Sequence, residues 1–103
     1  MVVNMNVLTT EAIWCLARPD ARPAALQAGL DFVCSQRYIN CAPINNGGNC
    51  FLPNTLVNHA SWAYDTYWKR NGRTLSACNF AGTGVIVIAG KDPSTPTCKY
   101  PPA

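Results

Sequence analysis

The sequence has 103 residues, few of them charged (13 %), and a formal net charge of +3. This length is that of one domain. The basic residues are scattered, and only Lys69, Arg70 and Arg73 form a small group, whereas nucleic-acid-binding proteins usually carry a dense basic stripe. No run approaches the roughly 18 apolar residues of a membrane-spanning helix. We therefore expect a monomeric domain that neither binds nucleic acid nor inserts into a membrane.

Cysteine is the strongest signal in so short a chain. The six cysteines are Cys15, Cys34, Cys41, Cys50, Cys78 and Cys98. An even number predicts three disulfides and an oxidising compartment, against the alternative of six reduced thiols in a cytosolic protein. Zinc ligands usually come in pairs about two to four residues apart, which no pair here matches, and the chain has one histidine. We expect no metal and no cofactor. Spacing leaves the pairing open, although the short Cys34–Cys41 loop suggests itself.

The two ends of the chain are predicted to lie outside the domain. Residues 1–12 are expected to be an unstructured lead, residues 13–100 the disulfide-rich domain, and residues 101–103 a tail. The first ten residues have neither a basic start nor a continuous apolar stretch, so they do not resemble a signal peptide. Because disulfides form after export, we expect the chain to be one domain of a longer secreted protein.

A first helix is predicted over about 23–34. Pro23 suits the first helical position, where its missing N–H group would have no partner in any case. Leu26, Leu30 and Val33 then follow at spacings of four and three, which marks one apolar face of a helix.

A second, longer helix is predicted over about 55–70. Asn54 is a suitable N-cap, because its side chain can accept a backbone N–H of the first turn. Asn71-Gly72 gives a natural end, since glycine readily takes the left-handed conformation that closes a helix. After Cys78, the β-branched run within about 84–89 predicts a strand, and we expect residues 97–100 to pair with it. The fold class is therefore α+β, mainly α.

One aromatic residue on the longer helix breaks its polar pattern. At 100° per residue, Trp62 falls among Asn58, Asp65 and Lys69, opposite the apolar face. A sugar ring has an apolar C–H face and a rim of hydroxyls, so an exposed indole among polar side chains suits it. We predict that Trp62 stacks on a sugar while these three polar residues contact hydroxyls. Tyr64 and Trp68, at the border of the apolar face, are secondary candidates. The alternative is that a loop, for example 38–50, covers the indole.

Several longer motifs carry a resemblance to a known family. They are W-C at 14–15, L-Q-A-G-L-D-F-V-C at 26–34, C-A-P-I at 41–44, G-G-N-C-F-L-P-N-T at 47–55, H-A-S-W-A-Y-D-T-Y-W at 59–68, G-R at 72–73, C-N-F at 78–80 and D-P-S at 92–94. This pattern resembles carbohydrate-binding module family 43, the plant X8 domain of β-1,3-glucanases, olive-pollen allergens and plasmodesmal callose-binding proteins. The resemblance covers about residues 13–100.

The resemblance implies a fold, a disulfide pattern and a function. It implies two helices, a small antiparallel β element, and bridges Cys15–Cys78, Cys34–Cys41 and Cys50–Cys98. It also implies non-catalytic binding of β-1,3-glucans such as callose and laminarin, which would target a parent protein, lipid-anchored or not, to the plant cell wall or plasmodesmata. The chain departs from the usual family residues at a few positions. Arg22 replaces a capping Ser or Thr, Ala42 a Gly, Trp62 a Tyr, Asp65 an Asn, and Thr95-Pro96 a Tyr-Gly.

An enzyme is not expected. A glycosidase needs two carboxyl groups flanking the scissile bond, and Asp31 and Asp65 fall on different predicted helices while the other acidic residues fall in turns or the lead. His59, the one histidine, lies near the start of the longer helix, where its ordinary role is to bond loop backbone. The alternative function is a cysteine-rich defence or inhibitor scaffold that does not bind glucan.

Overall fold

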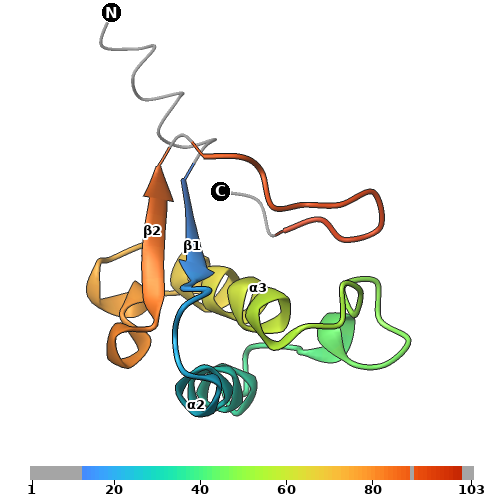
Figure 1. Cartoon of the computed structure of the whole chain (residues 1–103), viewed down its shortest axis with the longest axis horizontal. Helices are drawn as coiled ribbons and strands as arrows, with labels where there is room; N and C mark the ends of the chain where they lie inside the picture. Colours follow the sequence, from blue (N-terminus) through green and yellow to red (C-terminus); the bar gives the residue numbers. More distant parts are fainter. Residues whose placement is uncertain (1–12, 89, 101–103) are drawn as a thin grey trace, which may run out of the picture.

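The computed structural model describes residues 13–88 and 90–100. The predicted lead (1–12) and tail (101–103) lie outside the described residues. The elements, in chain order, are β1 (Ile13–Ala17), α2 (Pro23–Cys34), η1 (Ala42–Ile44), α3 (Leu56–Arg70), η2 (Ser76–Cys78), η3 (Phe80–Gly82) and β2 (Gly84–Ile88). The two α-helices pack against each other, and α3 also packs against β1 (Figure 1). The predicted fold class, α+β and mainly helical, is confirmed.

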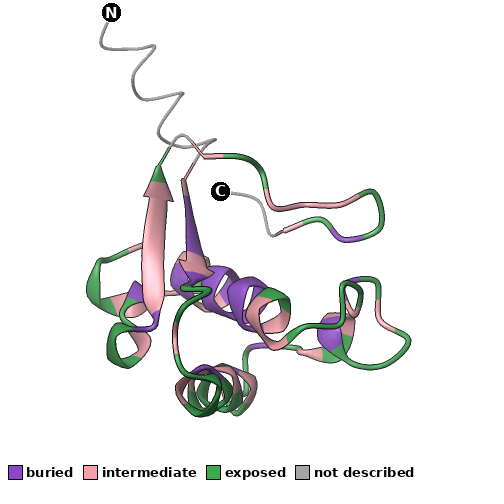
Figure 2. Cartoon of the chain, viewed as in Figure 1, coloured by how far each residue is buried: buried purple, intermediate pink, exposed green. Residues whose placement is uncertain are grey.

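Helix α3 forms the centre of the molecule. Its buried residues run without a break from Ala60 to Thr66, and seven consecutive residues span about two turns of a helix. The middle of α3 is therefore enclosed on every side (Figure 2). Ala60 and Ala63 are buried, as their place on the apolar face predicted. The enclosure of the polar face was not predicted.

The ends of the helices follow local sequence signals, with one correction. Helix α2 begins at Pro23 and has the predicted bounds. Helix α3 ends beside Gly72, whose φ of 79° lies in the left-handed region. The predicted N-cap of α3, Asn54, is wrong by one residue. Thr55 is extended and its Oγ1 accepts the N–H of Asn58 at 3.1 Å.

The predicted partner of the second strand is wrong. Strand β2 pairs antiparallel with β1, with Cys15 opposite Ile86. Residues 97–100 form no strand. The backbones of Thr95 and Cys98 instead bond to each other, with N–H to C=O distances of 2.8 and 3.2 Å, and close a turn. A turn of this kind leaves no extended segment to pair with β2.

The second edge of β1 is satisfied by side chains of α3. The N–H of Cys15 donates to Asp65 Oδ1 at 3.0 Å, and the N–H of Ala17 donates to Ser61 Oγ at 3.0 Å. Buried backbone N–H groups need such partners. Two polar residues of α3 thus take the place of a third strand and fix the sheet on the helix.

The disulfide pairing implied by the family resemblance is confirmed. Cys15 pairs with Cys78, Cys34 with Cys41, and Cys50 with Cys98. The first bridge ties β1 to η2, and the last ties the loop before α3 to the 92–100 segment. In the part of the chain that the structure describes, no helix has the length and apolar character needed to cross a bilayer.

Candidate functional site

Trp62, the predicted sugar platform, is only 6 % exposed, so the prediction of an exposed indole is wrong. The ring lines a small hollow together with Leu52, Pro93 and Tyr100. The hollow has a volume of about 20 Å³, which has room for a water molecule but not for a sugar ring. The cover over Trp62 comes from the loop before α3 and the 92–100 segment, and not from 38–50 as the alternative reading had it.

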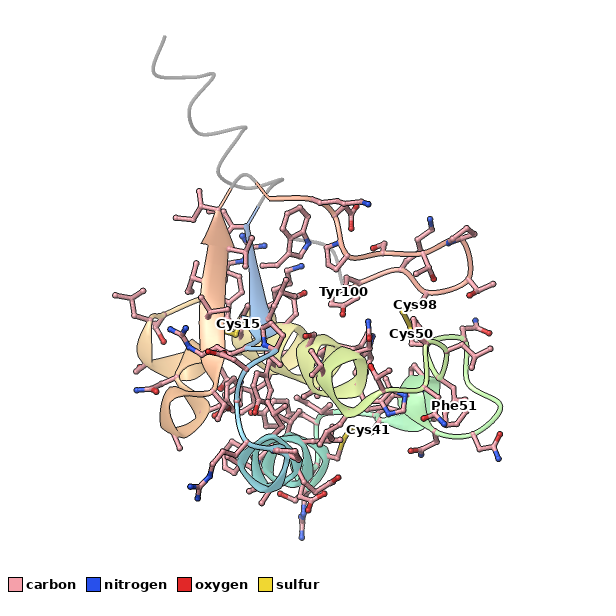
Figure 3. The ribbon with its side chains drawn as sticks, in the orientation of Figure 1. Cys15, Cys41, Cys50, Phe51, Cys98 and Tyr100 are labelled. Carbon is pink, nitrogen blue, oxygen red and sulfur yellow. A yellow bond between two sulfur atoms is a disulfide. The ribbon has the colours of Figure 1, made fainter. Side chains whose placement is uncertain are left out.

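The 92–100 segment is held against α3 by covalent and polar contacts. Figure 3 shows Cys98 beside Cys50, with Tyr100 close by on the same segment. The N–H of Tyr100 donates to Ser94 Oγ at 3.0 Å. Burial raises the pKa of the Tyr100 hydroxyl, and the nearby charges of Asp65 and Asp92 raise it further. The end of this segment therefore lies partly inside the domain, next to α3.

Asp65 and Lys69, two predicted sugar contacts, form a buried ion pair. Lys69 Nζ lies 2.8 Å from Asp65 Oδ2, and the Asp65 side chain is inaccessible. Burial raises the pKa of Asp65, while the bonds from Lys69 and from the Cys15 N–H oppose that shift. The pair joins α3 to β1, so its place in the structure is internal and it does not reach a ligand at the surface.

The secondary candidates Tyr64 and Trp68 are also core residues. The Tyr64 hydroxyl bonds Thr83 Oγ1 at 2.7 Å, and its ring stacks on Phe80 with the centroids 3.8 Å apart. The Trp68 indole N–H donates to the carbonyl of Thr74 at 2.9 Å. Both rings hold the 74–83 region against α3, so neither presents a face to solvent.

Asn58 is the one predicted sugar contact that the structure leaves exposed. It lies beside exposed Leu52, Pro53 and Asn54, and we call these four residues the Leu52 surface. The Leu52 side chain is 67 % exposed. Sequence analysis did not select it, although an apolar F-L-P run directly after a polar turn and a cysteine was a usable signal.

The loop that carries the Leu52 surface is fixed by the first turns of α3. His59 Nε2–H donates to the carbonyl of Phe51 at 2.7 Å, and the two rings lie 5.5 Å apart. The role predicted for this histidine, a bond to loop backbone, is confirmed. The Leu52 surface is thus a small apolar area with amide groups at its border, built on a rigid base.

A second feature lies on the other side of α3 and was not predicted. It is an open groove of about 570 Å³ between α2 and residues 76–81, with Tyr67 of α3 at its base. We call it the α2 groove. Phe32 at its side is 47 % exposed. The four α2 residues that line it, Ala25, Ala28, Gly29 and Phe32, recur with the period of a helix and were the available signal.

The family model of the X8 domain matches residues 13–85. This chain belongs to the X8 domain family. Its X8 domain is 41 % identical over 87 residues to the major pollen allergen Ole e 10 of Olea europaea, covering 84 % of this chain and 69 % of that protein. It is 35 % identical over 89 residues to plasmodesmata callose-binding protein 5 of Arabidopsis thaliana, covering 86 % of this chain and 48 % of that one.

The X8 domain also resembles a part of much longer proteins. It is 42 % identical over 92 residues to glucan endo-1,3-beta-glucosidase 2 of Arabidopsis thaliana, which is 89 % of this chain but 18 % of that protein. Most of the glucosidase therefore has no counterpart in the matched region.

Proposed function

We propose that this X8 domain binds β-1,3-glucan, the polymer class of callose and laminarin, without cleaving it. One observation carries the proposal. The same region is shared with a plasmodesmata callose-binding protein and with a small part of glucan endo-1,3-beta-glucosidases. The names of these otherwise different relatives have one polymer class in common, so a shared region for holding that polymer is the simplest account.

The arrangement of carboxylates supports binding without catalysis. A glycosidase needs two carboxyl groups facing one bond. The described carboxylates stand on separate parts of the fold: Asp20 follows β1, Asp31 is on α2, Asp65 is on α3, and Asp92 is near the chain's end. Asp65 is also enclosed and paired with Lys69. We therefore assign no catalytic residue.

The Leu52 surface is where we place the glucan. Leu52 and Pro53 offer apolar area for the C–H face of a glucose ring, and the amides of Asn54 and Asn58 can bond its hydroxyls. In this arrangement Trp62 supports the surface from beneath instead of stacking on the sugar. Of the residues predicted from sequence, the proposal keeps Asn58 in direct contact and Trp62 as its support.

The proposed setting is extracellular, at the plant cell wall or plasmodesmata. Three disulfides favour an oxidising compartment, and the callose-binding relative is named for plasmodesmata. In this setting, the domain would hold a larger parent protein on the polymer.

An NMR titration with laminarin, beside cellulose and xylan oligosaccharides, tests the proposal. We expect laminarin to shift resonances of residues 52–58 and the other two glycans to leave them unchanged. Leu52→Ala should weaken binding about tenfold, since partial burial of a leucine contributes about 1.4 kcal/mol or more. Ile88→Ala is the matched control, because Ile88 is also 67 % exposed and lies at the end of β2. Equal binding by the wild type and Leu52→Ala would remove this surface from the proposal.

A further inference from the structure

The α2 groove has the shape of a binding site. Its volume, about 570 Å³, lies within the ~300–1,000 Å³ of small-molecule sites. One wall is α2, which contributes Ala25, Ala28 and Phe32 at helical spacing. The opposite wall is the 76–81 segment, including Ala77 and Phe80.

Small residues keep the groove open. A Cβ on Gly29 would come within 2.1 Å of the Tyr64 hydroxyl oxygen, so the close approach of that buried ring requires glycine here. Ala25 and Ala28 on the same wall have side chains too short to reach across. The hollow therefore follows from the sequence of α2, since longer side chains at these positions would fill it.

The aromatic side chains of the groove hold one another in fixed positions. Tyr67 meets Phe32 edge-on at 5.4 Å and Phe80 edge-on at 5.5 Å, and the far face of the set is closed by the stack of Phe80 on Tyr64. Phe80 and Ala81 have φ values of 46° and 54°, a left-handed conformation that residues with side chains adopt only at a cost. Such conformations gather at ligand clamps, and this one directs Phe80 into the groove.

The chemistry of the lining selects a neutral ligand with an apolar face and a polar rim. All the residues that line the groove are uncharged, and the aromatic ones are joined by the hydroxyl of Ser76. At the Phe32 end, the Tyr67 hydroxyl bonds the side chain of exposed Tyr38, to which Asn71 Nδ2 also donates at 3.0 Å. Aromatic rings with neutral hydroxyls and amides nearby match a pyranose.

Two other ligand classes fit less well. An extended peptide would place its own N–H and C=O groups against a helix wall whose backbone groups are already bonded within α2, and unpaired polar groups are costly to bury. An acyl chain gains most when it is enclosed, whereas half of Phe32 remains open to solvent. A sugar ring can rest its C–H face on the rings and keep its hydroxyls in water.

We propose that the α2 groove is a second carbohydrate-binding site, which takes a short stretch of β-1,3-linked glucose. This inference rests on the proposed function for its ligand class. The two sites lie on opposite sides of α3, because α2 packs on one side and the 92–100 segment lies on the other (Figure 1). One domain would then hold two glucan strands and bridge them.

Two alanine substitutions on α2 separate the sites. Ala28→Met fills the α2 groove with a side chain that favours helices, and Ala24→Met is its control, because Ala24 is equally exposed on α2 and does not line the groove. In an NMR titration with laminarihexaose, the wild type should show shifts both at residues 52–58 and around Phe32 and Phe80. Ala28→Met should weaken the second set at least tenfold and leave the first unchanged, and Ala24→Met should change neither.

Bridging gives a second readout. Wild-type protein should cluster long laminarin chains, as measured by light scattering, while Ala28→Met and Leu52→Ala should each bind laminarin without clustering it. Shifts at residues 52–58 alone, with full clustering by Ala28→Met, would overturn the second site and leave the proposed function standing. Absence of shifts in both regions would overturn both proposals. Groove shifts with oleate but not with laminarihexaose would replace the sugar by a lipid and also overturn this inference.

Discussion

The two sides of α3 are closed in different ways. On one side, the 92–100 segment is tied by Cys50–Cys98 over Trp62. On the other, α2 packs through side chains against Tyr64 and Tyr67, and leaves a groove beside them. The side of α3 with the polar sequence pattern is therefore the better covered one, and the apolar side has the larger opening.

This contrast shows that the polarity of a helix face does not settle its exposure in a small disulfide-rich domain. A polar face can be buried if its polar groups find partners there. Asp65 does so through Lys69 and the Cys15 N–H. Conversely, an apolar wall of alanines can remain partly open, because no large side chain crosses to fill it. Ligand contacts are better sought where apolar area stays exposed.

The largest expected effect comes from removing the bridge that closes the Trp62 side. Cys50 and Cys98 are 48 residues apart, so the double variant Cys50→Ala, Cys98→Ala should lose about 4 kcal/mol of unfolding free energy in the chain-entropy model. Its native tryptophan emission should shift to the red as Trp62 meets water, and the shift should vanish in a Trp62→Phe background.

The short bridge gives the matched control. Cys34 and Cys41 are 7 residues apart, and replacing both by alanine should cost about 2.5 kcal/mol without a red shift. Both quantities are measured by denaturant unfolding followed by fluorescence. If Trp62 stays shielded after Cys50 and Cys98 are replaced, the cover does not depend on the bridge and the contrast between the two sides is wrong.

The next effect tests the buried polar groups on the same side. Asp65→Ala removes the carboxylate paired with Lys69 and the acceptor of the Cys15 N–H. Breaking such a buried pair should cost roughly 3 kcal/mol, measured by urea unfolding at pH 7. Asp20→Ala, in the exposed turn after β1, should stay within about 0.5 kcal/mol of the wild type. A similar small loss for Asp65→Ala would mean that the ion pair does not stabilise the fold.

Asp65 should also give a defined dependence of stability on pH. Burial raises its folded pKa above the usual value of 3.8, although Lys69, Arg73 and the Cys15 N–H hold it down in part. The folded state then binds this proton more tightly than the unfolded chain, so the residue's contribution to the unfolding free energy falls as pH rises above 3.8 and levels off above the folded pKa. Asp65→Asn cannot titrate, so its stability relative to wild type should increase over that window. A difference that does not change with pH would contradict the raised pKa.

Local signals made the helices predictable. Pro23 and the apolar spacing after it determine α2, and Asn71-Gly72 determines where α3 ends, because these signals act within a few residues of the chain. The disulfide pairing came from the family resemblance, since spacing alone left it open. The partner of β2 was missed because β1 is a short apolar run without the alternation that marks a strand.

The candidate site was less predictable because it depends on contacts between distant segments. Helical periodicity placed Trp62 among polar residues but contained no information on the 92–100 segment, which reaches it only through Cys50–Cys98. The α2 groove likewise needs α2 and residues 76–81 to come together. Sequence did identify Asn58 as an accessible polar group, since it lies in the first turn of α3, where the capping geometry is local.

A smaller effect concerns the α2 side. Gly29→Ala places a methyl group against the Tyr64 ring and hydroxyl, and overpacking of this kind should cost about 1–3 kcal/mol. Tyr64→Phe removes the nearest atom, so the double variant should lose less stability than the sum of the two single losses. Thermal unfolding of the four proteins gives the coupling. Additive losses would show that Gly29 and Tyr64 do not constrain each other and that the groove wall has another cause.

The smallest expected effect compares two neighbouring residues at the start of α3. Thr55 Oγ1 accepts the N–H of Asn58, so Thr55→Ala should cost about 1 kcal/mol, while Asn54→Ala, which removes the cap expected from sequence, should change stability little. Because the first turn of α3 carries Asn58, Thr55→Ala should also weaken laminarin shifts on the Leu52 surface and leave those in the α2 groove intact. Calorimetry for stability and the same NMR titration for binding decide this. If Asn54→Ala proves the more costly, the cap belongs to Asn54, and if Thr55→Ala affects both sites equally, the two sides of α3 are coupled and cannot bind glucan independently.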